Sequence, residues 1–106
     1  MRNNFIVVLV TVANKQEAEK IAQTLLEAKL IACANVVERA TSYFRWGGKI
    51  ECTNEMLIIM KSRKDLFEEL SGKVRGIHSY EVPEIIALPI VAGLREYLEW
   101  LDNSLK

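Results

Sequence analysis

Residues 34–61 have the sequence ANVVERATSYFRW-GG-KIECTNEMLIIMK, in which Gly47-Gly48 separates two strand-like runs of 13 residues each. Both positions of a tight hairpin turn take positive φ, which glycine adopts without steric cost, so the pair predicts a β-hairpin. A two-residue turn places Phe44 opposite Glu51 and Trp46 opposite Lys49. The sequence leaves open whether a bulge shifts this register.

Each arm of the predicted hairpin is longer than a compact domain of this size is wide. At about 3.3 Å per residue an arm spans about 43 Å, whereas the diameter of such a domain is about 33 Å. We therefore expect the hairpin to extend beyond its core and to expose Tyr43, Phe44, Trp46 and Ile50. Because exposed apolar hairpins aggregate unless another chain covers them, these four residues predict the interface of a closed homo-oligomer. The alternative is that the arms break into shorter strands, since strands average about five or six residues.

The segment before the hairpin predicts a strand and a helix. Residues 5–12 (FIVVLVTV) are β-branched and continuously apolar, which is typical of a strand covered on both faces. Asn14 stands where a helix N-cap belongs, with Glu17 three residues later. The helix that follows is expected to end near Lys29. Its apolar face comprises Ala18, Ile21, Ala22, Leu25 and Leu26.

The segment after the hairpin predicts a second helix, a strand and a short final helix. Ser62 and Asp65 are candidate caps of the second helix, which we expect to end near Gly76. In the strand predicted at residues 84–90, Pro89 lacks an N–H and therefore favours an edge position. The final helix has its apolar positions at Leu94, Tyr97, Leu98 and Leu101.

The predicted order of elements is βαββαβ plus a C-terminal helix, in a single domain over residues 1–106. A ferredoxin-like antiparallel sheet with strand order 4-1-3-2 places the first and third strands at its centre. These two strands are the continuously apolar ones, and the strand with Pro89 then lies at an edge. We therefore predict an α+β, ferredoxin-like fold with a long hairpin between its second and third strands.

Composition excludes two classes of partner. The 14 Lys and Arg residues balance 14 Asp and Glu residues, so the sequence has neither the basic face of a nucleic-acid-binding protein nor a polybasic membrane anchor. Residues 5–12 are too few to cross a bilayer, which takes about 20 residues. Arg2 is the one charged residue before this run, so we expect no signal peptide. We therefore expect a cytoplasmic protein whose thiols are reduced.

The single histidine lies in residues 77–84 (IHSYEVPE), together with a phenol and two carboxylates. These groups serve acid–base and metal chemistry, so an enzyme using His78, Tyr80 and Glu81 is one hypothesis. The spacing favours the alternative, a structural loop in which His78 is hydrogen-bonded. The sequence contains no nucleotide-binding loop and no nucleophile motif. We therefore predict that the protein is not an enzyme.

A single chain offers few metal ligands, because its one His and two Cys are far apart in the sequence. An oligomer brings copies of each ligand together at its interfaces. On that basis His78 is the best candidate ligand, followed by Glu81, Glu84 and Cys52. Cys33, between two alanines, is expected to be a small core residue, whereas Cys52 on the hairpin is expected to be exposed.

A different hypothesis is a cleft that binds a small anionic molecule. Lys61 and Arg63 stand near the start of the second predicted helix, where an anion can be held. Tyr80 and Trp46 complete the candidate residues of this cleft.

Four segments resemble the CutA divalent-ion tolerance family. They are residues 30–36 (LIACANV), 43–51 (YFRWGGKIE), 78–85 (HSYEVPEI) and 97–100 (YLEW). Ser79 stands where the family usually has proline. Val10 and Ile77 stand where some bacterial members have a Cys and a His credited with binding copper, so His78 alone remains of that ligand set.

The resemblance implies a ferredoxin-like fold, related in shape to PII signalling proteins, and a homotrimer whose long hairpins pair between subunits. It also implies binding of copper or other divalent cations and a role in metal tolerance, and no enzymatic activity is established for the family. The predicted function is therefore that of a trimeric divalent-cation tolerance protein. The alternative is a PII-like sensor that binds a small anionic ligand in clefts between subunits.

Overall fold

The structure is a computed structural model that describes residues 4–106. In chain order its elements are β1 (Phe5–Val12), α1 (Lys15–Glu27), β2 (Cys33–Trp46), β3 (Lys49–Arg63), the short 3₁₀ helix η1 (Lys64–Leu66), α2 (Phe67–Ile77), β4 (Ile85–Pro89) and α3 (Arg95–Asn103). The four strands form one antiparallel sheet in the order β2-β3-β1-β4. The predicted α+β, ferredoxin-like arrangement is confirmed, with Pro89 on an edge strand.

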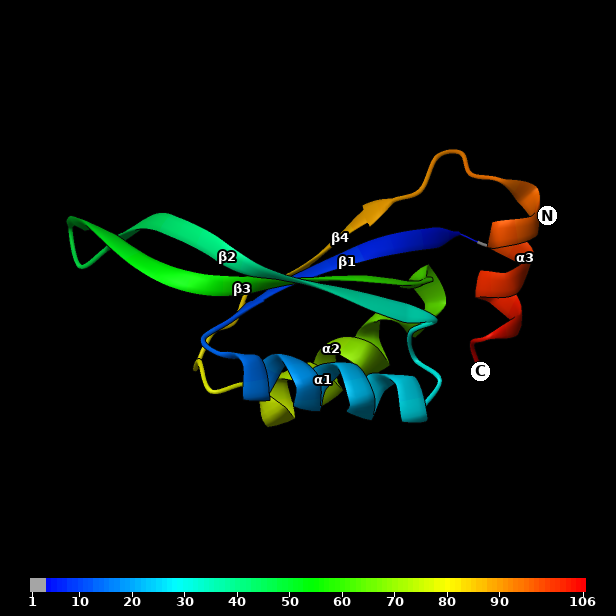
Figure 1. Ribbon diagram of the computed structural model, residues 1–106, viewed down its shortest axis with the longest axis horizontal. Coiled ribbons are helices and arrows are strands. Elements are labelled where there is room, and N and C mark those ends of the chain that lie inside the picture. Colours follow the sequence, from blue (N-terminus) through cyan, green and yellow to red (C-terminus); the bar gives the residue numbers. More distant parts are fainter. Residues whose placement is uncertain (1–3) are drawn as a thin grey trace.

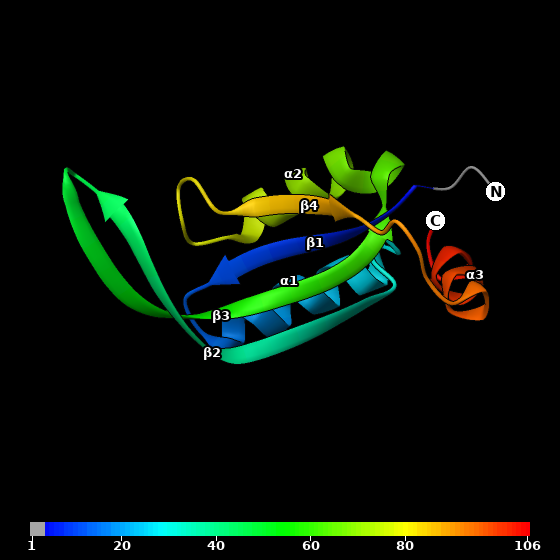
Figure 2. The ribbon, with the colours of Figure 1, turned by 90° about the horizontal axis from the view of Figure 1, so that it is seen from above.

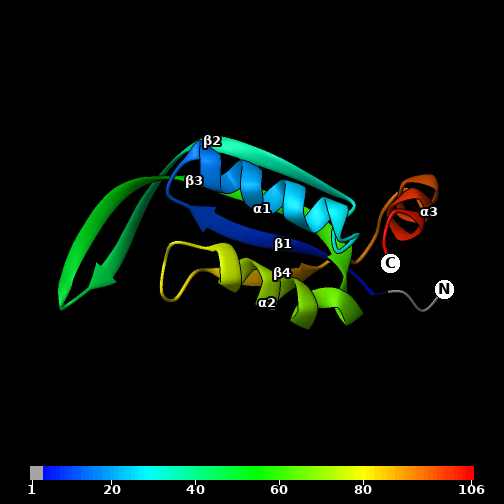
Figure 3. The ribbon, with the colours of Figure 1, turned by 90° about the horizontal axis from the view of Figure 1, so that it is seen from below.

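Two helices cover one face of the sheet. α1 and α2 lie side by side beneath the strands in Figure 1 and in front of them in Figure 3. Figure 2 shows the opposite face, which no helix of residues 4–106 covers; α3 lies beyond one end of the sheet. The core lies between the sheet and the two helices. Its fully buried residues include Val8, Val10, Ile21, Leu25, Ile58, Met60, Leu70 and Val74.

The hairpin has the predicted length and turn. β2 has 14 residues and β3 has 15, so the alternative in which each breaks into shorter strands is wrong. Gly47 (φ 57°) and Gly48 (φ 77°) form the turn, and Trp46 pairs with Lys49 as predicted. The two strands extend well beyond the sheet in Figure 1, and the molecule measures 46 × 26 × 23 Å.

A β-bulge lies in the middle of the hairpin. Val37 pairs with Leu57 and Ala40 pairs with Glu55, so Glu38 and Arg39 together oppose one residue of β3. This bulge settles the question of register that the sequence leaves open. A bulge bends its strand and increases the local twist, and the hairpin turns away from the sheet beyond this point (Figure 2). We call residues 41–54, beyond the bulge, the arm.

Two capping predictions for the second helix are wrong. The buried Ser62 hydroxyl donates to the carbonyl oxygen of Leu30 at 2.6 Å instead of capping a helix. Asp65 lies within η1 and pairs with Arg63, with 2.8 Å between the carboxylate and Nε. α2 then begins without a side-chain cap. On α1, Leu26 of the predicted apolar face is 41% exposed.

The start of α1 is capped as predicted and is also tied to the loop before β4. The Asn14 side chain accepts from the Glu17 N–H at 2.9 Å, and the Glu17 carboxylate accepts from the Ala13 N–H at 3.2 Å. The other Glu17 oxygen accepts from the Ser79 N–H at 2.5 Å. Burial alone raises the pKa of Glu17, but hydrogen bonds from Ser79 and Ala13 outweigh it, and the pKa lies below its usual value.

This network predicts a pH-dependent contribution of Glu17 to stability. A carboxylate whose pKa is lowered on folding stabilises the protein above its unfolded pKa, and this stabilisation is lost as the pH falls through the folded value. We expect Glu17→Gln to lower the free energy of unfolding by about 1.5 kcal/mol at neutral pH. The difference from wild type should shrink below about pH 4. Urea unfolding of both proteins across this range measures it.

Glu19→Gln, on the exposed side of the same helix, is the matched control and should unfold like wild type at every pH. A Glu17→Gln deficit that stayed constant from neutral to acidic pH would contradict the assignment.

Candidate functional site

His78 is held by the protein through both of its ring nitrogens. Its side chain is fully buried. Nε2 lies 2.7 Å from the carbonyl oxygen of Thr11, and Nδ1 accepts from the Tyr80 N–H at 3.1 Å. A carbonyl can only accept and a backbone N–H can only donate, so the ring adopts the Nε2–H tautomer. A metal ion can bind His78 only if one of these hydrogen bonds is broken.

Tyr80 links the same loop to the hairpin. Its hydroxyl donates to Glu55 Oε2 at 2.7 Å, and its ring centroid lies 4.7 Å from that of His78. Glu55 is only 8% exposed. Burial raises the pKa of Tyr80 to about 12, assisted by the hydrogen bond to Glu55 and by the Glu55 charge. The hydroxyl therefore remains a donor over the whole physiological pH range.

Sequence reasoning missed both carboxylates that contact this loop. Glu17 was identified only as part of a helix cap, and its bond to Ser79 spans 62 residues of sequence. Glu55 stands between the polar residues 53–54 and the apolar run 56–60. That boundary was its only signal, and a charged residue there is normally solvated.

The four predicted metal ligands do not form a site within one chain. Glu81 and Glu84 are exposed in the loop before β4, and Cys52 is exposed on the arm opposite Tyr43. His78 is buried. Among residues 4–106, no three His, Cys, Asp or Glu side chains are grouped so that they could hold a metal ion. This donor set therefore suits a metal ion only if several copies of the chain contribute to one site.

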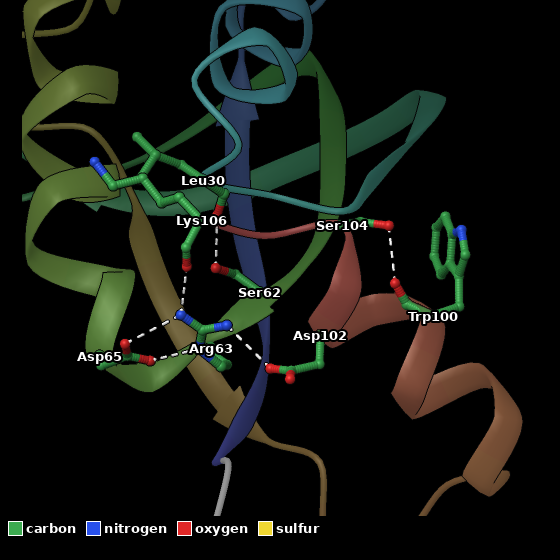
Figure 4. A network of polar contacts seen from close by, with 8 residues as sticks. All are labelled: Leu30, Ser62, Arg63, Asp65, Trp100, Asp102, Ser104 and Lys106. Carbon is green, nitrogen blue, oxygen red and sulfur yellow. Dashed lines mark hydrogen bonds and ion pairs between the residues drawn. The ribbon is translucent and has the colours of Figure 1, made fainter.

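Arg63 anchors the end of the chain to β3 (Figure 4). Its Nε donates to Asp65 at 2.8 Å, Nη1 donates to Asp102 at 3.0 Å, and Nη2 donates to the main-chain oxygen of Lys106 at 2.7 Å. Three separate segments, η1, α3 and residue 106, thus converge on one guanidinium group. Its donors already point at protein acceptors rather than at a cleft.

The other candidates for an anion-binding cleft are also spread along the molecule. Lys61 Nζ donates to Asn35 Oδ1 at 2.6 Å, and Tyr80 donates to Glu55. Trp46 lies at the far end of the arm and is 73% exposed. A cavity of about 490 Å³ between α2 and β4 contains none of the predicted site residues.

The predicted interface residues are all exposed on the arm. Tyr43, Trp46 and Ile50 are each more than 70% exposed, and Phe44 is 43% exposed. Cys33 is only partly buried, contrary to the expectation of a core residue, and its Sγ lies 3.5 Å from the Tyr97 hydroxyl.

Two further apolar surfaces lie outside the arm. The strand registers place one set of apolar side chains on the sheet face without helices. We call this set the open face: Val7, Leu9, Val37, Leu57, Ile59, Ile86 and Leu88. A second set lies at the end of the molecule opposite the arm, on α3 and just before it. We call it the α3 patch: Val91, Leu94, Tyr97 and Trp100.

Names of similar proteins place them in different compartments. "Protein CutA, chloroplastic" of Arabidopsis thaliana is 46% identical to this chain over 99 residues, which are 93% of this chain but 54% of that protein. This chain thus spans about half the length of that relative. A solved structure from Archaeoglobus fulgidus, the "Periplasmic divalent cation tolerance protein CutA", is 43% identical and superposes with a TM-score of 0.91, covering 98% of this chain and 99% of that chain. Within residues 4–106, no helix is long and apolar enough to cross a membrane. The cytoplasmic location of this chain stays a prediction.

The same likeness extends over the whole described fold. The crystal structure of CutA1 from Oryza sativa has a TM-score of 0.94 and 44% identity, and the match covers 97% of this chain and 94% of that chain. Residues 6–104 match the family described as CutA1 divalent ion tolerance protein. Since the match spans both the helices and the full sheet, the chain belongs to the CutA1 divalent ion tolerance family.

Proposed function

We propose that this protein acts as a homotrimer that binds copper or other divalent cations at sites shared between its subunits, without catalysing a reaction. The open face carries the proposal. β1 is apolar on both faces, but helices cover only one of them. The remaining face presents Ile86 at 48% and Leu88 at 49% exposure. A contiguous apolar surface of this kind marks a protein interface.

The positions of the exposed apolar surfaces favour a ring. A two-fold dimer needs one patch that is complementary to itself, whereas a cyclic assembly joins two different patches on successive copies. The arm and the α3 patch are two such surfaces, at opposite ends of the 46 Å long axis. The number of three subunits follows from the family resemblance.

The exposed side chains are the proposed metal ligands. A thiol such as that of Cys52 suits copper, and the carboxylates of Glu81 and Glu84 can complete its coordination. Cys52 lies on the arm, opposite Tyr43 and away from the core of its own chain, which supports a role at a site shared with a neighbouring subunit. His78 can join this set only by giving up its bond to Thr11 or to Tyr80.

The sensor alternative has weaker support. Lys61 and Arg63, the two cations that it requires, already donate to acceptors within their own chain.

The proposed function makes a first prediction, which concerns assembly. We expect wild type to have a mass three times that of the 12.1 kDa chain in light scattering at micromolar concentration. The double substitution Trp46→Glu/Ile50→Glu places two charges on the arm, where the partner surface would leave them buried and unpaired, and should yield the single-chain mass. Leu26→Glu, which adds a charge on α1 away from the open face, is the control and should remain trimeric. A wild-type protein of single-chain mass would refute the proposal.

The second prediction concerns metal binding and uses copper titration by calorimetry. Cys52→Ser and the pair Glu81→Gln/Glu84→Gln should each weaken the copper Kd about tenfold or more, because each removes proposed ligands. His78→Gln should leave the Kd unchanged, because both ring nitrogens of His78 are already engaged within the protein. Glu19→Gln is the control for a lost surface charge. If Cys52→Ser and the double Gln variant bind copper like wild type, the proposed ligands are wrong.

A further inference from the structure

The arm begins just beyond the point where β3 stops pairing with β1. The pairing between β1 and β3 ends at Val12 with Met56. Beyond that pair, among residues 4–106, the strands of the hairpin pair only with each other. An isolated two-stranded ribbon is marginally stable and strongly twisted. The direction of the arm therefore depends on what holds its base.

Glu55 lies at this base. It is the residue next to Met56, on the arm side, and its partner across the hairpin is Ala40 at the edge of the bulge. Residues 49–54 of β3 are all exposed, whereas Glu55 is 8% exposed. The bend and the one buried carboxylate of the hairpin thus coincide.

A series of contacts through His78 and Tyr80 connects the end of β1 to Glu55, where direct pairing between β1 and β3 has ended. The carbonyl of Thr11, near the end of β1, bonds to the His78 ring. His78 accepts from the Tyr80 N–H and lies against the Tyr80 ring. The Tyr80 hydroxyl then reaches Glu55 on β3 at 2.7 Å. The loop therefore connects the end of β1 with the base of the arm.

We propose that the hydrogen bond between Tyr80 and Glu55 fixes the direction of the arm and so prepares it for assembly. Tyr80 is then a positioning residue for the oligomer, and the part of this inference that concerns assembly rests on the proposed trimer. Tyr80 stays protonated, and hence a donor, well above neutral pH. An arm held in one direction before association loses less conformational freedom when it binds a neighbouring subunit.

The test compares Tyr80→Phe with Tyr97→Phe. Both substitutions remove one phenol hydroxyl, but the Tyr97 hydroxyl contacts Cys33, at the end of the molecule opposite the arm. Hydrogen exchange measured by mass spectrometry on the full chain follows peptides from the arm and from β1 and α1. The measurement is made in wild type and in the Trp46→Glu/Ile50→Glu background, where the subunits are expected to be separate.

In both backgrounds Tyr80→Phe should speed exchange in the arm about tenfold, which is the effect of losing one such bond. Exchange in β1 and α1 should stay within about twofold. In the Trp46→Glu/Ile50→Glu background, where no neighbouring arm contacts the α3 patch, Tyr97→Phe should leave exchange in the arm unchanged. Adding Glu55→Gln to Tyr80→Phe should produce no further increase, because both changes act on one contact. In the trimer, Tyr80→Phe should raise the protein concentration at half-dissociation several-fold.

Light scattering on the same samples separates this inference from the proposed function. If the parent is a single subunit and Tyr80→Phe still loosens the arm, the trimer fails and the positioning of the arm by Tyr80 stands. If the parent is trimeric and arm exchange is unchanged in both backgrounds, the inference is overturned. Equal acceleration in the arm and in β1 also overturns it, because the bond then stabilises the whole fold rather than the arm. Unchanged dissociation with a loosened arm removes the role in assembly.

Discussion

Burial of the central strands is the constraint on which the rest of the structure depends. β1 lies between β3 and β4 and is apolar on both faces, so each face must be removed from water. Burying a Val, Leu or Ile side chain stabilises a fold by about 1.5–3 kcal/mol. α1 and α2 meet this demand on one face, where Val8 and Val10 are fully buried. No helix of residues 4–106 covers the other face, and this uncovered apolar surface is the basis of the proposed assembly.

The reactive residue types are used mainly to hold loops in place. His78 and Tyr80 are the groups that chemistry would select first, yet their polar atoms are paired with Thr11, Glu55 and each other. Arg63 is similarly engaged, with η1 and α3. Buried polar groups are costly unless they are hydrogen-bonded, so such pairing is the expected condition of a structural network. Of the proposed metal ligands, Cys52, Glu81 and Glu84 are exposed and His78 is buried.

Features set by local pattern could be predicted from the sequence. Gly47-Gly48 specified the turn and its pairs, Asn14 specified the cap of α1, and Pro89 specified an edge strand. Contacts between distant segments could not be predicted. Nothing near Glu55 indicates that a tyrosine 25 residues later will cover it, and Ser62 has the composition of a cap although it bonds across the sheet end to Leu30. The bulge was equally hidden, because it depends on how strand pairs adjust to twist and not on residue type.

That bulge also changes the register of the hairpin. Before the bulge, odd-numbered residues of β2 pair with odd-numbered residues of β3, as Val37 does with Leu57. After the bulge, even-numbered residues of β2 pair with odd-numbered residues of β3, as Phe44 does with Glu51. Alternation along β3 is unbroken, so Phe44 and Trp46 continue the side to which Val37 belongs. Deleting either Glu38 or Arg39 would remove the bulge but keep Phe44 opposite Glu51 and Trp46 opposite Lys49, because the Gly47-Gly48 turn fixes those pairs. The arm can therefore change length in evolution by matched pairs of residues, whereas a residue lost at the bulge alters the bend of the hairpin and not the set of side chains that share a surface.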